Sequence, residues 1–519
     1  MLKDGPRSRA FVRVSIVLLR AVAPLSAAYC IARLAGWRPP LLSGVLYAVD
    51  AYAGTEAAFC FVCRVRRWWL NRPAPQHPLK FSPEERKELF ARTWKGTPNP
   101  RGYLSLWFKG VPIEDLCRED IKDWISWRMW NEIERSGLNE DELEDYLVHA
   151  EKVLNWKFPD GRSTHTSMAV TFEPLPIIHR PLLWYCFIGG ADLEMCAFMR
   201  YFGFNFHSGG FSRLLTSLPI RPWAILTLQR SPSPQIPYWC LPHTSPDHIP
   251  ILFIHGVGVG LHFYLNFFKD FLSELRPLGI GMIALEILPI SSRITGPFLQ
   301  EAQTAQEIQK ILNQHGWTRC VVMSHSYGSV VAAHMLHDPS TSHMIGPMVF
   351  VDPVAFSFHP PEVAWNFLRR RPTTASEIQL HYFASTDPDV AYTLTRRFIW
   401  SENTLWREDV EHRAIAQDGS GKRCTITLAG KDIITDTNTL GCYLTRSEVE
   451  GESWYEQEDA LDDDWKHSKW AGKGPLEVIW FPDLNHAEVF DDAKDRRLLL
   501  QVLEVYSSDG VGALHEIDT

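Results

Sequence analysis

The sequence has little of what marks a disulfide-rich, metal-binding or nucleic-acid-binding protein. Its 10 cysteines are scattered along 519 residues without paired spacing, which indicates a reducing compartment and no disulfide framework. The single C-x-x-C, from Cys60 to Cys63, lies inside an apolar run and lacks a second pair, so it predicts no metal site. The net charge of −9 is mild, and no basic block runs through the body of the chain. Nucleic acid is therefore not an expected partner.

What the chain does have is the composition of a folded protein. Hydrophobic residues make up 45% of it and charged residues 22%, which excludes a disordered chain. Its length exceeds one ordinary core and predicts two or three structural units. The 20 tryptophans and 28 phenylalanines fit an aromatic-rich core as well as they fit apolar ligands or a membrane interface.

Residues 1–72 differ in composition from the rest and predict a hydrophobic hairpin that anchors the protein in a membrane. Two apolar stretches, 11–37 and 41–63, are each close to the roughly 20 residues that span a bilayer. Charged residues interrupt both stretches, and each ionised side chain inside a span costs about 2.5–3.5 kcal/mol, which disfavours two independent helices. In a hairpin, Arg20 and Glu56 would fall at similar depth and could pair.

The charges at its two ends predict the orientation of this hairpin. Lys3, Arg7 and Arg9 precede it, and Arg64, Arg66 and Arg67 follow it. By the positive-inside bias, both ends and the body behind them are expected on the cytosolic side. The endoplasmic reticulum and the lipid-droplet surface are candidate locations. Two alternatives stay open: an in-plane amphipathic anchor, and a cleaved mitochondrial transit peptide, because the first 40 residues are arginine-rich and nearly free of acid.

Residues 73–220 predict a mainly helical extension. A helix is expected from Pro83, with Ser82 as its N-cap and Glu85 completing a capping box. Trp124, Trp127 and Trp130 recur at three-residue spacing, which is more typical of a packing face than of a ligand site. No motif assigns this region a role, and a helical cap or docking layer is the expectation.

Residues 221–519 alternate between short apolar runs and helical stretches. This alternation predicts an α/β domain with a mostly parallel sheet wrapped by helices, whose ligands bind outside the carboxyl ends of the strands. The expected strands are "WAILTLQ", "PYWCL", "IPILFIHG", "GIGMIALEI", "RCVVMSHS", "PMVFVDP", "RCTITLAGKD" and "LEVIWFPD".

The run around Ser326 resembles the strand, sharp turn and helix that carry a nucleophilic serine. The usual pattern is G-x-S-x-G, and here Ser324 replaces the first glycine while Gly328 keeps the second. Small residues are needed on both sides because the turn is tight, and serine is small enough at the first position. Ser326 is the expected nucleophile, since neither Ser324 nor Ser329 sits centrally between two small residues. His325 is expected to pack in the turn.

Two later loops supply a candidate acid and a candidate base. Asp432 follows the strand-like run "CTITLA" and is the candidate acid, with Asp436 as a backup. Asp352, after "MVFV", is the stronger competitor. His486 follows the last expected strand and precedes the C-terminal helix, and it is the candidate general base.

With these segments in order, the chain resembles the α/β-hydrolase superfamily, of the AB hydrolase-1 type, over roughly residues 221–510. Within it the chain is similar to fungal membrane-associated α/β-hydrolases, mostly uncharacterised, that carry an N-terminal extension. The resemblance implies a triad of Ser326, Asp432 and His486. It also implies an oxyanion hole made by the N–H groups of Val257, in "HGVGVG", and Tyr327. That glycine segment lacks the third glycine of a dinucleotide fingerprint, and no cofactor is expected.

The expected activity is that of a serine hydrolase that cleaves a carboxylic ester through an acyl-enzyme. A lid is expected at about residues 354–422, and its apolar and aromatic composition suits an acyl or lipid ester. An acyltransferase is an alternative, because His486 and Asp491 fit H-x-x-x-x-D. A catalytically silent membrane scaffold is a further one. The oligomeric state is left open.

Two side-chain clusters are predicted to hold no metal. The acidic insertion at 448–466 lacks the alternating ligands of a calcium loop and is expected to be a solvated loop. His334, His337 and His343 are expected on the surface, since no carboxylate completes a metal site.

Overall fold

The computed structural model describes residues 4–40, 42–72, 79, 81–95, 97–210, 216–357, 359–414, 423–445 and 463–512. Lys3 and most of the acidic insertion predicted at 448–466 lie outside these residues.

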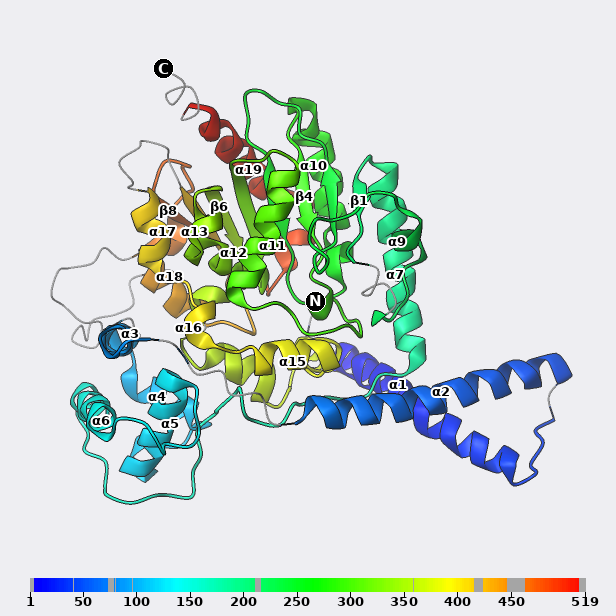
Figure 1. Cartoon of the computed structure of the whole chain (residues 1–519), viewed down its shortest axis with the longest axis horizontal. Coiled ribbons are helices and arrows are strands. Elements are labelled where there is room, and N and C mark those ends of the chain that lie inside the picture. Colours follow the sequence, from blue (N-terminus) through cyan, green and yellow to red (C-terminus); the bar gives the residue numbers. More distant parts are fainter. Residues whose placement is uncertain are drawn as a thin grey trace.

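One eight-stranded sheet forms the centre of the body, in the order β1-β2-β4-β3-β5-β6-β7-β8 (Figure 1). The β2 strand is antiparallel to both neighbours, and the other pairs are parallel. This arrangement is the α/β-hydrolase fold that the sequence predicted. The strands are β1 (Asn205–His207), β2 (Tyr238–Leu241), β3 (Ile251–Ile254), β4 (Met282–Leu285), β5 (Cys320–His325), β6 (Ile345–Val351), β7 (Cys424–Ala429) and β8 (Leu476–Phe481).

Two apolar cores lie on the two faces of this sheet, which explains why strands such as β3 and β4 are apolar throughout. In β3, Ile251 and Phe253 face one core, and Leu252 and Ile254 face the other. Successive side chains of a strand point to opposite faces, so a strand with helices on both sides needs apolar residues at every position.

Helices cover both faces of the sheet (Figure 1). The helices α10 (Leu265–Glu274) and α19 (Ala493–Gly512) pack on one core, and α11 (Glu301–Gln314), α12 (Gly328–His337) and α18 (Thr437–Thr445) pack on the other. The remaining short elements of the body are η2 (Gly260–Tyr264), η3 (Arg276–Leu278), η4 (Leu288–Ile290), α13 (Pro339–Ser342), η9 (Asp464–His467) and η10 (Glu488–Phe490).

The start of the sheet differs from the expectation. The run "WAILTLQ" was expected to be a strand, but the structure has the helix α9 (Pro222–Leu226) there. Proline at the first helical position has its φ already set for a helix, and it lacks only an N–H that would have no partner there. The first strand is instead β1, three residues long, which precedes residue 221 and pairs with β2. A run this short carries no periodicity that a sequence could reveal.

Most of the segment between β6 and β7 forms a layer of short helices below the sheet in Figure 1, and its last helix, α17, lies beside β8. Two of them, η6 and η7, are π-helical, and such turns are frequent at functional sites. The elements are η5 (Ala355–Ser357), η6 (Ala364–Arg369), α14 (Ala375–Leu380), η7 (His381–Ser385), α15 (Pro388–Arg396), α16 (Trp400–Asn403) and α17 (Arg407–Ala414). We call residues 354–414 the lid segment.

The N-terminal residues form two long helices, α1 (Pro6–Leu34) and α2 (Ser43–Leu70), that pack against each other and project from the body (Figure 1). Both are long and apolar enough to cross a membrane and fit the predicted membrane hairpin, and the same holds for α7 (Leu182–Tyr201). We call α1 and α2 the hairpin.

Polar contacts inside the hairpin differ from those expected. The ion pair between its helices joins Arg33 to Asp50 at 2.9 Å. Glu56 does not pair with Arg20. Its side chain is fully buried and its Oε2 accepts a hydrogen bond from the N–H of Leu182 at 2.7 Å. Because Leu182 is the first residue of α7, a carboxylate of the hairpin stabilises the positive end of a helix of the body.

The extension consists of α3 (Pro83–Lys95), α4 (Pro100–Trp107), η1 (Ile113–Asp115), α5 (Arg118–Trp130) and α6 (Glu140–Leu154). The capping box at the start of α3 is confirmed, because Glu85 N–H donates to Ser82 Oγ and Ser82 N–H donates to Glu85 Oε2. The tryptophans at 124, 127 and 130 are buried, as expected of a packing face.

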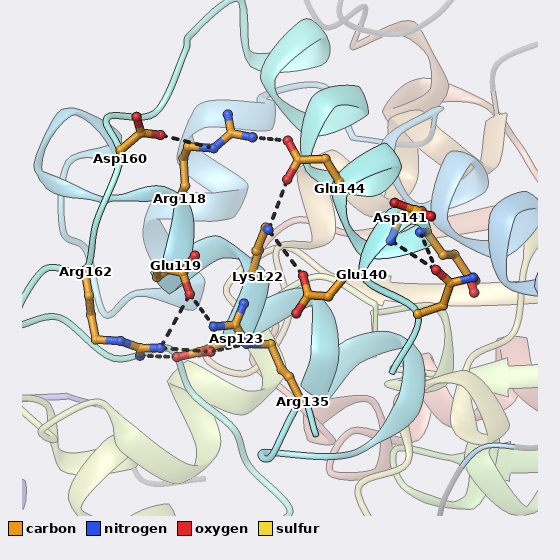
Figure 2. A network of polar contacts seen from close by, with 12 residues as sticks. Arg118, Glu119, Lys122, Asp123, Arg135, Glu140, Asp141, Glu144, Asp160 and Arg162 are labelled. Atoms are coloured by element: carbon orange, nitrogen blue, oxygen red, sulfur yellow. Dashed lines mark hydrogen bonds and ion pairs between the residues drawn. The ribbon is translucent and has the colours of Figure 1, made fainter. Parts of the chain in front are cut away.

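On its outer side, a network of charged residues links α5 to α6 (Figure 2). Lys122 Nζ lies 3.0 Å from Glu144 and 3.4 Å from Glu140, and Arg118 also contacts Glu144. Partly exposed pairs of this kind contribute about 0–1 kcal/mol each. The buried tryptophan face therefore contributes more to the stability of the extension than this network does.

The extension packs on the lid segment. Trp400 Nε1 donates to the carbonyl of Arg128 at 2.8 Å, and Arg128 Nη1 donates to the carbonyl of His359 at 3.0 Å. Arg92 forms an ion pair with Glu408 at 2.5 Å. The extension is thus a layer that covers the lid segment from outside.

Candidate active site

Ser326 lies in a tight turn between β5 and α12, and the backbone explains why small residues flank it. Its φ is +50°, a left-handed conformation that is uncommon for residues other than glycine and persists only where the surroundings hold it. A Cβ on Gly328 would lie 2.4 Å from the carbonyl oxygen of Ile254, and one on Gly256 would lie 2.8 Å from Ser326 Cβ. Glycine is therefore required at both positions.

The three side chains predicted to be nucleophile, base and acid are joined in one chain of hydrogen bonds. Ser326 Oγ is 2.8 Å from His486 Nε2, and His486 Nδ1 is 2.7 Å from Asp432 Oδ2. A carboxylate only accepts hydrogen bonds, so Nδ1 carries the proton and Nε2 of the neutral ring accepts from the serine hydroxyl. The backup acid, Asp436, lies elsewhere, where it accepts from Thr439 at the start of α18.

Asp352, the competing acid, contacts the backbone beside the histidine. Its Oδ2 accepts a hydrogen bond from the N–H of Ala487 at 2.8 Å. Burial raises the pKa of Asp352 to about 7, against the lowering effect of His486. It therefore holds the loop that carries the histidine, while Asp432 contacts the ring.

Charge around His486 favours its protonated form. Burial lowers the pKa of the ring, but the charge and hydrogen bond of Asp432, with the charge of Asp352, outweigh burial and leave the pKa above its ordinary value. Asp432 is held in turn by the N–H groups of Ile434 and Thr435, which donate to its Oδ1 at 2.7 and 3.1 Å. The pair of Asp432 and His486 is thus held at both ends, by these N–H groups at the carboxylate and by Ser326 Oγ at the ring.

A phenol that sequence reasoning missed supports the turn. Tyr264 Oη lies 2.7 Å from Nδ1 of His325 and accepts from the N–H of Gly256 at 3.0 Å. Burial, and then the neighbouring His486, lower the pKa of His325 well below its usual value. His325 therefore stays neutral and packs in the turn, in agreement with the sequence. Tyr264 carries no motif of its own that could have marked it.

The remaining serines of the turn have other environments. Ser329 Oγ donates to the carbonyl of Ser326 at 2.6 Å and accepts from the N–H groups of Val354 and Ala355. It therefore ties α12 to the chain after β6. Ser324 Oγ is buried and has no hydrogen-bond partner among the described residues.

Two backbone N–H groups beside Ser326 are free of other partners. Among the described residues, neither Val257 N–H nor Tyr327 N–H donates to another protein group. Both residues line the same cavity as Ser326. Such N–H groups can hold a negatively charged oxygen, and Tyr327 also precedes the first turn of α12, where the helix dipole favours negative charge.

The cavity at Ser326 is small and apolar. Its volume is about 30 Å³, close to the space that one water molecule needs. The other lining residues are Val354, Val363, Phe367, Leu368, Leu394, Phe398 and Ile434, most of them from the lid segment. An acyl chain does not fit this volume, so side chains of the lid segment must move before a substrate enters.

Among the described residues there is no group of three potential ligands that could hold a metal ion. His334 was expected on the surface, but it is buried and its Nε2 lies 2.9 Å from Asn403 Oδ1. His337 lies 3.0 Å from Glu301. These two histidines join α12 to neighbouring elements, which a sequence cannot reveal.

Comparisons with known proteins give distant likenesses only. Neither a protein-family model nor a curated protein sequence matches the chain. A membrane phospholipase A described as a bacterial virulence factor is similar with a TM-score of 0.34 and 11% identity, over 62% of this chain and 93% of that chain. A carboxylesterase from Bacillus subtilis gives 0.34 and 9%, over 60% and 97%. A thermophilic esterase from Thermogutta terrifontis gives 0.33 and 11%, over 52% and 95%.

Proposed function

We propose that the protein is a serine hydrolase that cleaves a carboxylic ester through an acyl-enzyme. One observation carries this proposal: His486 bridges Ser326 Oγ and Asp432 Oδ2 at hydrogen-bond distance, beside an apolar cavity. The same three residue types in this arrangement perform acyl transfer on unrelated folds, so the argument rests on the geometry and not on the fold.

The steps follow from the atoms at the site. Ser326 Oγ attacks the ester carbonyl carbon while His486 Nε2 takes its proton, and the N–H groups of Val257 and Tyr327 hold the oxyanion. The carbon–oxygen bond to the alcohol then breaks, and the proton on Nε2 passes to the departing alcohol. Water, activated by the same nitrogen, cleaves the acyl-enzyme and releases the acid. Asp432 stabilises the charged ring during both transfers.

The substrate class that suits the site is an ester with an apolar acyl group. The cavity wall is apolar, and its lid residues must move for the acyl chain to enter. The hairpin would hold the site near a membrane, from which an acyl or lipid ester could be drawn. We also propose that the body lies on the cytosolic side, as the charges around the hairpin predict, and that the fungal membrane-associated hydrolases with an N-terminal extension are its relatives.

Labelling with a fluorophosphonate probe tests the proposal. We expect the full chain to be labelled on Ser326 and the Ser326→Ala variant to be unlabelled. Ser324→Ala is the matched control, because Ser324 is two residues away and its hydroxyl makes no hydrogen bond among the described residues. Labelling that survives Ser326→Ala, or no labelling of the folded protein, would contradict the proposal and favour a silent scaffold. Products formed with and without an alcohol acceptor separate hydrolysis from acyl transfer.

A further inference from the structure

A second, larger cavity lies between the hairpin and the body, away from Ser326. Its volume is about 540 Å³, within the range of small-molecule sites. Its walls come from α1, from α2, from residues 177–180 and from the starts of α7 and α15. Figure 1 shows the hairpin passing directly below α15.

The polar part of this wall is strongly basic. Five arginines and one histidine line it, and its described lining residues include no carboxylate: Arg20, Arg64, Arg66, Arg67, His179 and Arg180. Arg66 and Arg180 already have partners, in Asp389 at 2.7 Å and the carbonyl of Thr386 at 2.7 Å. Arg180 is nevertheless 1% exposed, and its Nε is buried with no partner among the described residues.

The other three arginines have no ion-pair or side-chain hydrogen-bond partner in the part of the chain that the structure describes: Arg20, Arg64 and Arg67. They come from both helices of the hairpin. All three are exposed to solvent and line the same cavity, so an anion there would gain three cationic partners that have no competing carboxylate among the described lining residues. Arginine also matches phosphate in geometry, because its parallel N–H groups donate to two oxygens at once.

The rest of the wall is mostly apolar. The hairpin contributes Ala23, Pro24, Ala27 and Phe61 to it, and the body contributes residues such as Ile177 and Tyr185. A ligand that uses the whole cavity is therefore amphipathic, with an anionic head among the arginines and a hydrocarbon part along the two helices. Basic pockets beside membrane helices on the cytosolic side bind the head groups of anionic lipids, which matches the position and chemistry of this wall.

We propose that this cavity binds the phosphate of an anionic phospholipid, with the acyl chains along the hairpin. The site is distinct from the proposed ester-cleaving site, which has an apolar wall with no arginine among its lining residues. Its occupation does not depend on Ser326.

Titration of the detergent-solubilised full chain with dioctanoyl phosphatidylglycerol tests the proposal, with dioctanoyl phosphatidylcholine and inorganic phosphate as comparison ligands. Each titration is repeated in the Ser326→Ala variant, which separates binding here from any turnover. The test variant is the triple substitution Arg20→Gln, Arg64→Gln and Arg67→Gln. The matched control, Arg7→Gln with Arg13→Gln and Arg38→Gln, removes the same three charges from exposed hairpin positions outside the cavity.

We expect saturable binding of phosphatidylglycerol that weakens about tenfold or more in the cavity triple variant and by less than about twofold in the control. Equal binding of phosphatidylcholine, equal weakening in both triple variants, or no weakening in the cavity variant would overturn the proposal. Competition by inorganic phosphate at the concentrations at which the lipid binds would overturn it too, and would assign the site to a soluble anion. If the triple variant does not fold, the single Arg64→Gln variant with Arg38→Gln as control replaces it, with about threefold weakening expected.

Discussion

The two cavities share one helix and differ in almost everything else. Pro388, at the start of α15, lines the basic cavity of about 540 Å³, and Leu394 of the same helix lines the apolar cavity of about 30 Å³. They lie about 9 Å apart along the helix axis. The larger cavity has room for a small molecule. The smaller one has room for about one water molecule, so an acyl group can enter it only when side chains of the lid segment move.

The sharpest way to separate the two cavities is to remove the nucleophile. Ser326→Ala is expected to lower kcat by about 10⁴-fold or more, because the covalent step loses its attacking oxygen. The same variant is expected to bind phosphatidylglycerol as the unaltered protein does. Ester-hydrolysis kinetics and lipid titration on one preparation measure both. A change in lipid affinity after this substitution would mean that the lipid occupies the small cavity.

The two aspartates near His486 are expected to differ in the size of their effects. Asp432→Asn is expected to lower kcat by about 10³–10⁴-fold, because the ring loses the charge that stabilises its cation and fixes its tautomer. Asp352→Asn is expected to cost about tenfold or less, since an amide oxygen can still accept from Ala487 N–H. Steady-state kinetics of both variants decide the matter. A larger loss in Asp352→Asn than in Asp432→Asn would reverse the assignment of the acid.

The pH dependence of ester hydrolysis follows from the raised pKa of His486. The general base works only as the neutral ring, so activity is lost as pH falls through this pKa. We expect the acid limb of the kcat/KM profile to lie above pH 6.5, with a loss of about tenfold for each pH unit below it. In Asp432→Asn the limb is expected to move to lower pH. A limb that stays in place would mean that the ring does not titrate beside Asp432.

A substitution can change the wall of the small apolar cavity without changing the large basic cavity. Leu394→Ala is expected to enlarge the apolar cavity and to shift the ratio of kcat/KM for long over short acyl esters by about tenfold, at a cost of about 2–4 kcal/mol in stability. Leu405→Ala is the matched control, because Leu405 is a buried leucine of the lid segment that does not line the cavity. An equal shift in the control would assign the effect to general loosening.

The smallest expected effect is on the thermal midpoint, when arginines of the basic cavity are substituted and no lipid is bound. Arg64→Gln is expected to change the thermal midpoint by less than about 1 °C in lipid-free detergent, because an exposed and unpaired side chain contributes little to stability. Arg66→Gln is expected to lower it clearly more, since it removes the partner of the buried carboxyl of Asp389. Calorimetry of the two variants measures both thermal midpoints. Equal shifts would mean that Arg64 already has a partner.

How well the fold can be predicted from the sequence depends on the residue pattern in each segment. Strands such as β3 and β4 are apolar at every position, and this marks a sheet covered on both faces. The β1 strand has three residues and no period, and α9 begins at a proline inside an apolar run, so this stretch was misassigned. Local pattern predicts an element well only where its length allows a period to repeat.

The candidate site shows a similar limit. Ser326, Asp432 and His486 could be named because each follows a strand in an order known for this fold, and the structure brings them within hydrogen-bond distance. The contacts of Tyr264 with the turn and of Asp352 with Ala487 join segments distant in sequence, and no spacing encodes them. The same holds for the basic cavity, whose arginines come from both helices of the hairpin and from the body.

The contact between Glu56 and the start of α7 bears on how the protein is made and handled. Together with the pair of Arg66 and Asp389, it builds the hairpin into the folded body through buried carboxylates. A chain trimmed of its first 72 residues would expose the first turn of α7 and leave Asp389 without its cation. Recombinant production of residues 73–519 alone is therefore expected to yield aggregates, whereas the full chain in detergent is expected to fold.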